Sequence, residues 1–493
     1  MMFLLLLLCC VATGALACDE DYGSAFNSTG IACRITKPAA LVLNEQTTKV
    51  IEAAFTHAKY PDMGGEKSIL FIGKVRYGLN NLWISNVSIG KSEVELREDD
   101  AVGIDIANVS ATFKGTLTYG YGNWLVNLGH SLDFEIESQI DLEVNTKLYC
   151  RDGRVAADTS DCYLTFHRLL LHLQGDRQPG WIKKLFTDFV SFTVKLVIKS
   201  QICKEINNLA NILAGFIQER AELFLSDGDI GVDISITASP VLKASYIESH
   251  HKGLARLGNA TARISDSAFS PALLTESRML YFWISDQVLG PLVSAAHRDG
   301  RFVRHIAGEE LQGLFRTNLM AATPDFMSQL LSSESPEAKV WSLSDPQLWT
   351  TPQGTFVRSV SAVELKGVSA GHDLGLHFET EVEVVVRASY ADKKLFLDAK
   401  PSQVSILKAS TWVGNDLKEV SDVDFLKEVV EKIGVPKVVS YLEPGLTALM
   451  DSHGLSLFEL IDPEVVSQQG YVIVQLDFGF PHHLLVEFLQ RTL

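Results

Sequence analysis

Two stretches of alternating apolar and polar residues, one in each half of the chain, restrict the possible folds more than any other feature. From Leu132 to Leu148 every odd position is polar, and every even position is apolar except Ser138 and Thr146. Much the same alternation returns from Leu376 to Tyr390. Side chains alternate between two faces in a β-strand but not in a helix. The sequence therefore predicts two long, half-buried strands and, with them, two sheets that each bury one face.

Helical periodicity brackets both predicted sheets. Apolar residues recur at helical spacing from Pro38 to Tyr60, and Pro61 ends this pattern. The other helical stretches run from Gly180 to Ser226, from Ser270 to Arg298 and from Val420 to Ser452. The order of helix, strands and helix thus occurs twice, which predicts a duplicated α+β unit.

Stretches rich in Gly, Asn, Ser and Pro indicate where the halves are joined. A chain of 493 residues is long enough for two or more domains. His250 to Ser267 is the best candidate linker between them, because it contains glycines and an Asn-Ala-Thr sequence. Ser332 to Gln353 is predicted to be a second loose stretch.

The first seventeen residues predict a secretory signal peptide. Met1–Ala17 contains a run of leucines and ends in Ala15-Leu16-Ala17, the small-x-small pattern that signal peptidase recognises. No other segment approaches the roughly 20 uninterrupted apolar residues that a membrane span requires. The mature chain is therefore predicted to begin at Cys18 and to be secreted and soluble. Four Asn-x-Ser/Thr sequences are then candidate glycan sites, at Asn27, Asn86, Asn108 and Asn259.

Cysteine count and net charge narrow the possible functions. The five cysteines after the signal peptide are Cys18, Cys33, Cys150, Cys162 and Cys203, so at least one thiol stays unpaired, and the sequence alone does not choose partners. The net charge of −17 disfavours nucleic acids, anionic membranes and anionic bacterial lipid as main partners. A mean hydropathy of +0.12 is high for an acidic soluble protein. It indicates that some apolar surface is not buried when the chain folds.

The last seventeen residues, Asp477–Leu493, form an amphipathic pattern. Pro481 suits the start of a helix, and six apolar residues share one arc of that helix, namely Leu484, Leu485, Val486, Phe488, Leu489 and Leu493. Such a face needs lipid or a hydrophobic opening to cover it, or it packs on the core of its own chain.

Two patterns invite a catalytic or metal-binding interpretation. Gly367-Val-Ser-Ala-Gly371 fits the nucleophile sequence of lipases, which requires a sharp turn from a strand into a helix. Because a strand follows it here, we interpret it as a hairpin turn, with a secreted lipid hydrolase as the alternative function. The adjacent histidines of His250-His251 and His482-His483 diverge on a strand or helix and make no ready metal site.

Five motifs resemble one protein family. They are Cys33–Asn44, Cys162–His167, Gln201–Asn207, Ser226–Ser235 and Asp477–Pro481. With them the chain resembles the lipid-transfer and lipopolysaccharide-binding family, which includes bactericidal permeability-increasing protein and phospholipid transfer protein. The resemblance covers essentially the whole mature chain and is weakest from Ser332 to Asp373. It is closest to the neutral-lipid carriers of the family, because their C-terminal extension is present in full.

The resemblance implies an α+β fold: an elongated, curved molecule of two barrels, each a twisted antiparallel sheet with long helices, joined by a central β-sheet. An apolar tunnel would hold neutral lipid esters, with phospholipids as plugs. The implied division of the chain is a signal peptide at 1–17, an N-terminal barrel at 18–210, a central-sheet segment at 211–258, a linker at 259–278, a C-terminal barrel at 279–455, a return to the central sheet at 456–476 and a C-terminal amphipathic helix at 477–493.

The resemblance also implies function and site residues. The expected function is a plasma carrier that exchanges cholesteryl esters for triglycerides, with some phospholipid, between lipoproteins, as a monomer and without a cofactor, metal or bond chemistry. A phospholipid-transfer or lipopolysaccharide-binding role on the same fold is the alternative. The disulfide would join Cys162 to Cys203, which leaves Cys18, Cys33 and Cys150 free and Cys33 buried. The expected lipid-binding residues are Gln218, Arg220, Ser249, His251, Phe478, Phe480, Leu484, Leu485, Phe488 and Leu489.

Overall fold

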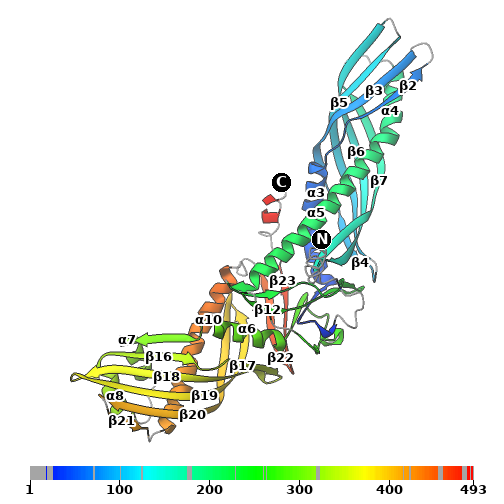
Figure 1. Ribbon diagram of the computed structural model, residues 1–493. Coiled ribbons are helices and arrows are strands. Elements are labelled where there is room, and N and C mark those ends of the chain that lie inside the picture. The colour runs from blue at the N-terminus through cyan, green and yellow to red at the C-terminus, as the bar shows by residue number, and fades with distance from the viewer. Residues whose placement is uncertain are drawn as a thin grey trace, which may run out of the picture.

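The computed structural model shows an elongated, bent molecule with two arms that meet at a central sheet (Figure 1). It describes Cys18 and residues 26–69, 73–99, 101–123, 126–174, 180–227, 229–258, 260–261, 264–317, 323–414, 416–420, 423–452, 459–479, 486–488 and 490–491. The predicted signal peptide and Asn259 lie outside these residues. No helix in the described part of the chain combines the length and the apolar character that crossing a membrane requires.

The N-terminal arm is a curled antiparallel sheet covered by helices α3 (Lys37–His57), α4 (Gly180–Phe189) and α5 (Lys195–Phe224). Its strands pair in the order β2-β3-β5-β6-β7, and β4 also pairs with β5. The strands are β2 (Met63–Ile69), β3 (Gly73–Ser88), β4 (Ser92–Leu96), β5 (Val102–Asn123), β6 (Val126–Arg151) and β7 (Arg154–Leu173). The first alternating stretch lies within β6, where its apolar residues Phe134, Ile136, Ile140, Leu142 and Val144 are buried, so this prediction is confirmed.

The C-terminal arm repeats this plan. Its sheet has the order β15-β16-β18-β19-β20-β21, and β17 also pairs with β18. The strands are β15 (Val303–Ala307), β16 (Glu334–Ser342), β17 (Gln347–Thr351), β18 (Gly354–Ser369), β19 (His372–Ala391), β20 (Lys394–Val413) and β21 (Asp416–Glu419). The helices are α7 (Gly308–Thr317), α8 (Asp325–Leu331), α9 (Val423–Val429) and α10 (Val435–Ser452). The second alternating stretch lies within β19, as predicted, and buries Leu376 and Phe378 in the core of this arm.

Two sheets join the arms, and their strands come from distant parts of the chain. The larger has the order β10-β11-β1-β14-β23-β22, and the smaller the order β13-β12-β9-β8. The larger contains β1 (Ile31–Thr36), β10 (Val241–Leu242), β11 (Tyr246–His251), β14 (Leu280–Ser285), β22 (Leu460–Gln468) and β23 (Tyr471–Phe478), and the smaller contains β8 (Ser226–Asp227), β9 (Ile230–Asp233), β12 (Leu254–Leu257) and β13 (Ala260–Thr261). The predicted domain boundaries put β1 and β14 in the two barrels, whereas both strands lie in the middle of the central sheet.

Three sequence-based expectations were wrong. Residues 270–298 are not one helix, because β14 occupies 280–285 and only α6 (Asp286–Arg298) is α-helical. In β14 the half-buried face is as apolar as the buried face that carries Tyr281 and Trp283, so no alternation shows. The loose stretch at 332–353 contains β16 and β17, and the candidate linker at 250–267 contains the end of β11 together with β12 and β13.

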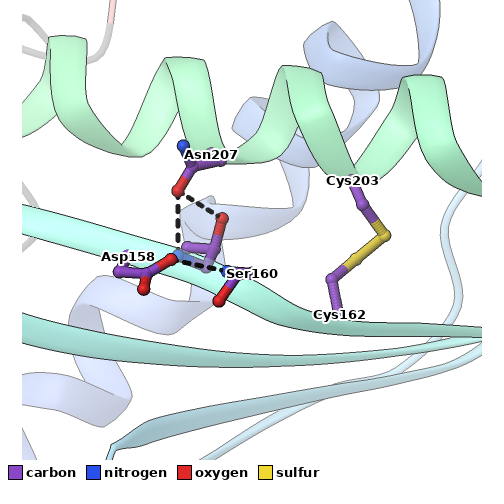
Figure 2. The surroundings of a disulfide bond; sticks show 6 residues. Asp158, Ser160, Cys162, Cys203 and Asn207 are labelled. Carbon is purple, nitrogen blue, oxygen red and sulfur yellow. Dashed lines mark hydrogen bonds between the residues drawn. A yellow bond between two sulfur atoms is a disulfide. The ribbon is translucent and has the colours of Figure 1, made fainter.

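Asn side chains and a disulfide attach the long helix α5 to the edge of the N-terminal sheet, and Figure 2 shows Asn207 and the disulfide. The Asn211 amide donates to the carbonyl of Ala157 and accepts from its N–H, at 2.7 and 3.1 Å. The side-chain carbonyl oxygen of Asn207 accepts from the N–H of Thr159 at 2.9 Å. Cys162 and Cys203, further along the same pair of elements, form the predicted disulfide. The helix thus satisfies backbone groups of the edge strand that a further strand would otherwise pair.

The C-terminal arm uses the same device without a disulfide. Glu443 and Thr447 of α10 accept from the N–H groups of Leu397 and Leu395 on β20, at 2.6 and 3.1 Å. Four helical residues rise about 6 Å, and two strand residues span about 6.7 Å. Side chains at i and i+4 of a helix therefore match N–H groups at alternate positions of a strand. A helix closes each half-barrel in this way.

Each long helix also contains a π-helical segment at the corresponding place. The segment η1 (Val190–Val194) separates α4 from α5, and η3 (Val430–Gly434) separates α9 from α10. One extra residue per turn rotates the following helix about its axis. Large apolar side chains are exposed on or after both segments: Phe192, which is 78 % exposed, Leu196 and Ile217 in the N-terminal arm, and Val438, Leu442 and Leu446 in the C-terminal arm.

The cysteines pair differently from the pattern that the family resemblance implied. Cys18 and Cys150 form a second disulfide, 132 residues apart in the sequence, so the expectation that both are free was wrong. Cys33 is the one free cysteine among the described residues, and it is half-buried. An odd number of thiols required at least one such residue. Cys18 is therefore covalently tied to the end of β6.

Candidate functional site

The C-terminal segment lies against the last turns of α5, in red beside the green helix in Figure 1. Residues 486–488 are helical, and the ring of Phe488 packs against that of Phe216 with 5.9 Å between the centroids. Phe488 is only 1 % exposed and belongs to the hydrophobic core of the N-terminal arm. Val486, two residues earlier, is half exposed. The end of the chain therefore places one aromatic side chain in that core and keeps another apolar side chain outside it.

Charged side chains surround the contact between these two rings. Arg220 of α5 pairs with Glu487, while Arg491 reaches back to Glu219 of α5 at 2.9 Å and to Glu487 at 3.5 Å. The guanidinium carbons of Arg220 and Arg491 each lie 5.3 Å from the centre of the Phe216 ring, within the range of cation–π contact. The contact is thus apolar at its centre and ionic at its rim.

Not all predicted residues of the terminal segment can be placed. Phe478 is the last residue of β23, where it pairs with Leu460 and is half-buried. Phe480, Leu484, Leu485 and Leu489 lie outside the described residues. Of the predicted apolar arc, the structure therefore places Val486 and Phe488.

The predicted residues Ser249 and His251 lie together on one face of the central sheet. The Ser249 hydroxyl and His251 Nε2 are 2.8 Å apart, and His251 Nδ1 is 2.8 Å from the carbonyl oxygen of Ile234. Cys33 is the cross-strand neighbour of Ser249. Burial lowers the pKa of His251, which favours the neutral imidazole near pH 7. This half-buried face presents small polar groups beside apolar residues of β1 and β14.

The opposite face of the same strands is fully covered. His250 is buried and lies 3.0 Å from Glu248, which pairs at 2.6 Å with the equally buried Arg34. The carbonyls of Leu274 and Pro271 accept further hydrogen bonds from that guanidinium, at 2.7 Å each. As predicted, the two neighbouring histidines diverge. The segment around residues 269–274 therefore closes one face of the central sheet, and the Ser249–His251 face is the one that remains partly open.

The thiol of Cys33 is expected to be unreactive in the folded protein. Burial, followed by the nearby Glu248 carboxylate, raises its pKa from 9.0 to about 12. Because only the thiolate reacts, alkylation by iodoacetamide at pH 8 should be slower than for an ordinary thiol by roughly 1,000-fold. The rate should become ordinary in urea and should rise in the folded protein only as the pH approaches 12. Rapid labelling of the native protein at pH 8 would contradict this pKa.

The remaining predicted residues define how far the site extends. Gln218 donates to Glu222 one turn later, at 3.1 Å, and Arg220 binds the C-terminal segment as described. No hydrogen bond or ion pair among the described residues joins this cluster to Ser249 and His251.

The glycan candidates Asn27, Asn86 and Asn108 are exposed. Ala370 and Gly371 both have positive φ in a two-residue turn between β18 and β19, so the Gly367–Gly371 pattern is the predicted hairpin turn.

Sequence patterns missed two partners of the terminal segment, Phe216 and Glu219. Both belong to a long amphipathic run in which an apolar residue is expected to face the core of its own arm. Their partners lie more than 270 residues later, and no local pattern reports such a contact. The only available signal was that Phe216 and Arg220 are one helical turn apart and therefore share a face.

Comparison with known proteins gives one family. Residues 40–215 match the model of the LBP / BPI / CETP family, N-terminal domain. The chain is 49 % identical to cholesteryl ester transfer protein of Gallus gallus, over 95 % of this chain and 94 % of the relative. It is 46 % identical to that of Homo sapiens, over 94 % and 95 %. It is 21 % identical to bactericidal permeability-increasing protein of Sebastes schlegelii, over 86 % and 89 %.

A solved structure shares the fold. The crystal structure of lipopolysaccharide binding protein matches 92 % of this chain and 99 % of its own chain, with a TM-score of 0.50 and 17 % sequence identity. The structural match supports the two-armed α+β architecture. At such a low sequence identity it carries no information on ligands.

Proposed function

The chain belongs to the LBP / BPI / CETP family, and from this premise we propose that it is a secreted lipid-transfer protein of blood plasma. Its cargo is neutral lipid, cholesteryl esters in exchange for triglycerides, together with some phospholipid, and its partners are the surfaces of lipoprotein particles. It acts as a monomer, binds lipid in an apolar tunnel and makes or breaks no covalent bond. Gln218, Arg220, Ser249 and His251, with the apolar residues of the terminal segment, contact the lipid.

The observation that carries this proposal is the position of Phe488. This ring, five positions before Leu493, lies in the core of the N-terminal arm, beside helix residues whose apolar side chains are exposed. Ile217 and Leu223, in the same turns of α5 as Phe216 and Arg220, are about half exposed. Exposed apolar groups next to a small helical plug are what an entrance for an apolar ligand requires.

The physical need for such a carrier is large. An acyl chain leaving a particle for water loses about 0.8 kcal/mol per methylene, so a cholesteryl ester faces more than ~10 kcal/mol before its sterol is counted. A covered apolar path removes most of this barrier. Binding and release are sufficient for this task, and no nucleophile or metal is needed. The net charge of −17 agrees better with neutral cargo than with anionic lipopolysaccharide.

The proposal is tested on the secreted full-length protein. Its lipids are extracted and identified by mass spectrometry, and transfer of labelled cholesteryl ester and labelled phosphatidylcholine between two lipoprotein fractions is measured in parallel. We expect bound cholesteryl ester or triglyceride and transfer of both labels. Phospholipid as the sole cargo, with no ester transfer, would favour the phospholipid-transfer or lipopolysaccharide-binding alternative. Release of free fatty acid that disappears with Ser369→Ala would show a lipid hydrolase instead.

A further inference from the structure

Four charged side chains form a continuous chain between α5 and the C-terminal segment. The order is Arg220, Glu487, Arg491 and Glu219, so the first and last belong to α5 and the middle two to the terminal segment. Positive and negative groups alternate along it, and the four charges sum to zero. Arg491 closes the chain by reaching back to the helix that carries its first member. Two ion pairs, Arg220–Glu487 and Glu219–Arg491, therefore join the two segments.

The apolar contact and the ion pairs contribute to docking in different ways. Phe488 and Phe216 exclude water from each other, which gives a non-directional attraction. The ion pairs lie at the rim, where Arg491 is 45 % and Glu219 is 54 % exposed, so each pair is weak and sensitive to salt. Weak rim charges chiefly fix the register and orientation of an interface. Without them, Phe488 could enter the core at several rotations of the terminal helix.

Neighbouring contacts leave Glu219 available for Arg491. The next acidic residue on α5, Glu222, already accepts a hydrogen bond from Gln218 at 3.1 Å and lies 3.8 Å from Arg154. Arg220 binds Glu487 through Nη2, whereas its buried Nε has no hydrogen-bond partner, so this pair is stabilised incompletely. The Arg491–Glu219 pair is therefore the second point that the terminal segment needs for a unique orientation.

We propose that Arg491 and Glu219 are positioning residues that form a salt-sensitive latch and hold the terminal segment closed over the N-terminal arm. This rests on the proposed function, in which the segment covers an entrance for lipid. When salt or another charged group competes for either partner, the docked state loses this contribution and a larger fraction of the segment is undocked. Opening and closing, rather than lipid affinity, is the step that these two residues control.

The test measures docking directly in the full-length protein. Val486→Cys gives an exposed attachment point for a fluorescent label, and the thiol of Cys33 is expected to stay unlabelled. Labelled proteins carrying Arg491→Glu, Glu219→Arg or both substitutions are compared by fluorescence anisotropy. Each single reversal should raise the ratio of undocked to docked segment by about three- to ten-fold, because it replaces an attraction by a repulsion. The double reversal should recover only part of this change, because positions 491 and 219 attract again whereas position 491 then repels Glu487.

Two further measurements separate the latch from general charge effects and from the proposed function. Raising NaCl from 0.05 to 0.5 M should raise the ratio of undocked to docked segment in the parent protein, and by less in Arg491→Ala. Arg76→Glu is the matched control, since it reverses an exposed arginine paired with Glu66 on β2 and β3 and should leave docking unchanged. No rescue in the double variant, or equal salt response in Arg491→Ala, would overturn the latch. Altered docking with unaltered ester transfer would keep the latch and contradict the entrance function of the segment.

Discussion

Phe488→Ala is expected to lower cholesteryl ester transfer by at least ~10-fold while phosphatidylcholine transfer changes little. The ring is buried against Phe216, and replacing a buried phenylalanine by alanine costs about 3–5 kcal/mol. Because Phe488 enters this core from the terminal segment and not from a strand or long helix of the arm, we expect the loss to affect docking of the segment more than the global stability. A loss of about 3 kcal/mol reduces the docked-to-undocked ratio by more than 100-fold. Transfer assays with both labelled lipids measure the effect.

The matched control lies in the same segment. Gln490→Ala removes an exposed polar side chain two residues later and should leave both transfer activities within about two-fold of the parent. Deletion of Pro481–Leu493 should reproduce Phe488→Ala, because both remove the docked ring. Unaltered ester transfer in Phe488→Ala would refute the role of this segment. Equal loss of ester and phospholipid transfer, accompanied by a lower thermal midpoint, would indicate damage to the N-terminal arm instead.

The two arms could be predicted from the sequence because their strands are long and half-buried. A strand such as β6 presents one face to the core and the other to water, so its residues alternate over many positions. The helices α5 and α10 were likewise visible as long amphipathic runs. The π-helical segments within these runs give no sequence signal, because one inserted residue changes the period too briefly to detect.

The central sheet could not be predicted for the opposite reason. Its strands β1 and β14 have six residues each, and the face that is only half-buried carries apolar residues as well, so neither strand shows alternation. Their pairing joins residues as far apart as Arg34 and Glu248, and no local pattern specifies a partner at that distance. The resemblance to a family supplied the central sheet in outline but assigned β1 and β14 to the barrels.

For each contact of the candidate site, the sequence indicated one partner and not the other. The apolar arc of Asp477–Leu493 indicated that the segment needs an apolar partner, and Phe488 has one. Its partner Phe216 resembled any core residue of α5. The disulfides show the same limit, because cysteine identity reveals the possibility of a bond and only three-dimensional proximity selects Cys18 for Cys150.

Removing the Cys162–Cys203 bond by replacing both residues with alanine is expected to destabilise the attachment of α5 to β7 by about 2–4 kcal/mol. The bond closes a loop of 41 residues in sequence separation, for which loss of unfolded-chain entropy predicts an upper value of about 4 kcal/mol. Alanine fills part of the space that the buried Cys162 side chain leaves. Hydrogen exchange at the amides of Ala157 and Thr159 reports the change directly, because those N–H groups donate to Asn211 and Asn207 on α5. Both amides should exchange at least ~30-fold faster.

The double variant Asn207→Ala with Asn211→Ala provides the comparison that assigns this effect to the disulfide. It removes the hydrogen-bond acceptors and keeps the covalent link, so the free energy of unfolding should fall by only about 1–3 kcal/mol. Exchange at Ala157 and Thr159 should then accelerate, whereas labelling of Cys162 and Cys203 should require a reductant. If the disulfide variant exchanges these amides no faster than the parent, the side chains of α5 alone hold the edge of the sheet. The N-terminal half-barrel would then be closed as the C-terminal one is, where Glu443 and Thr447 act without any covalent bond.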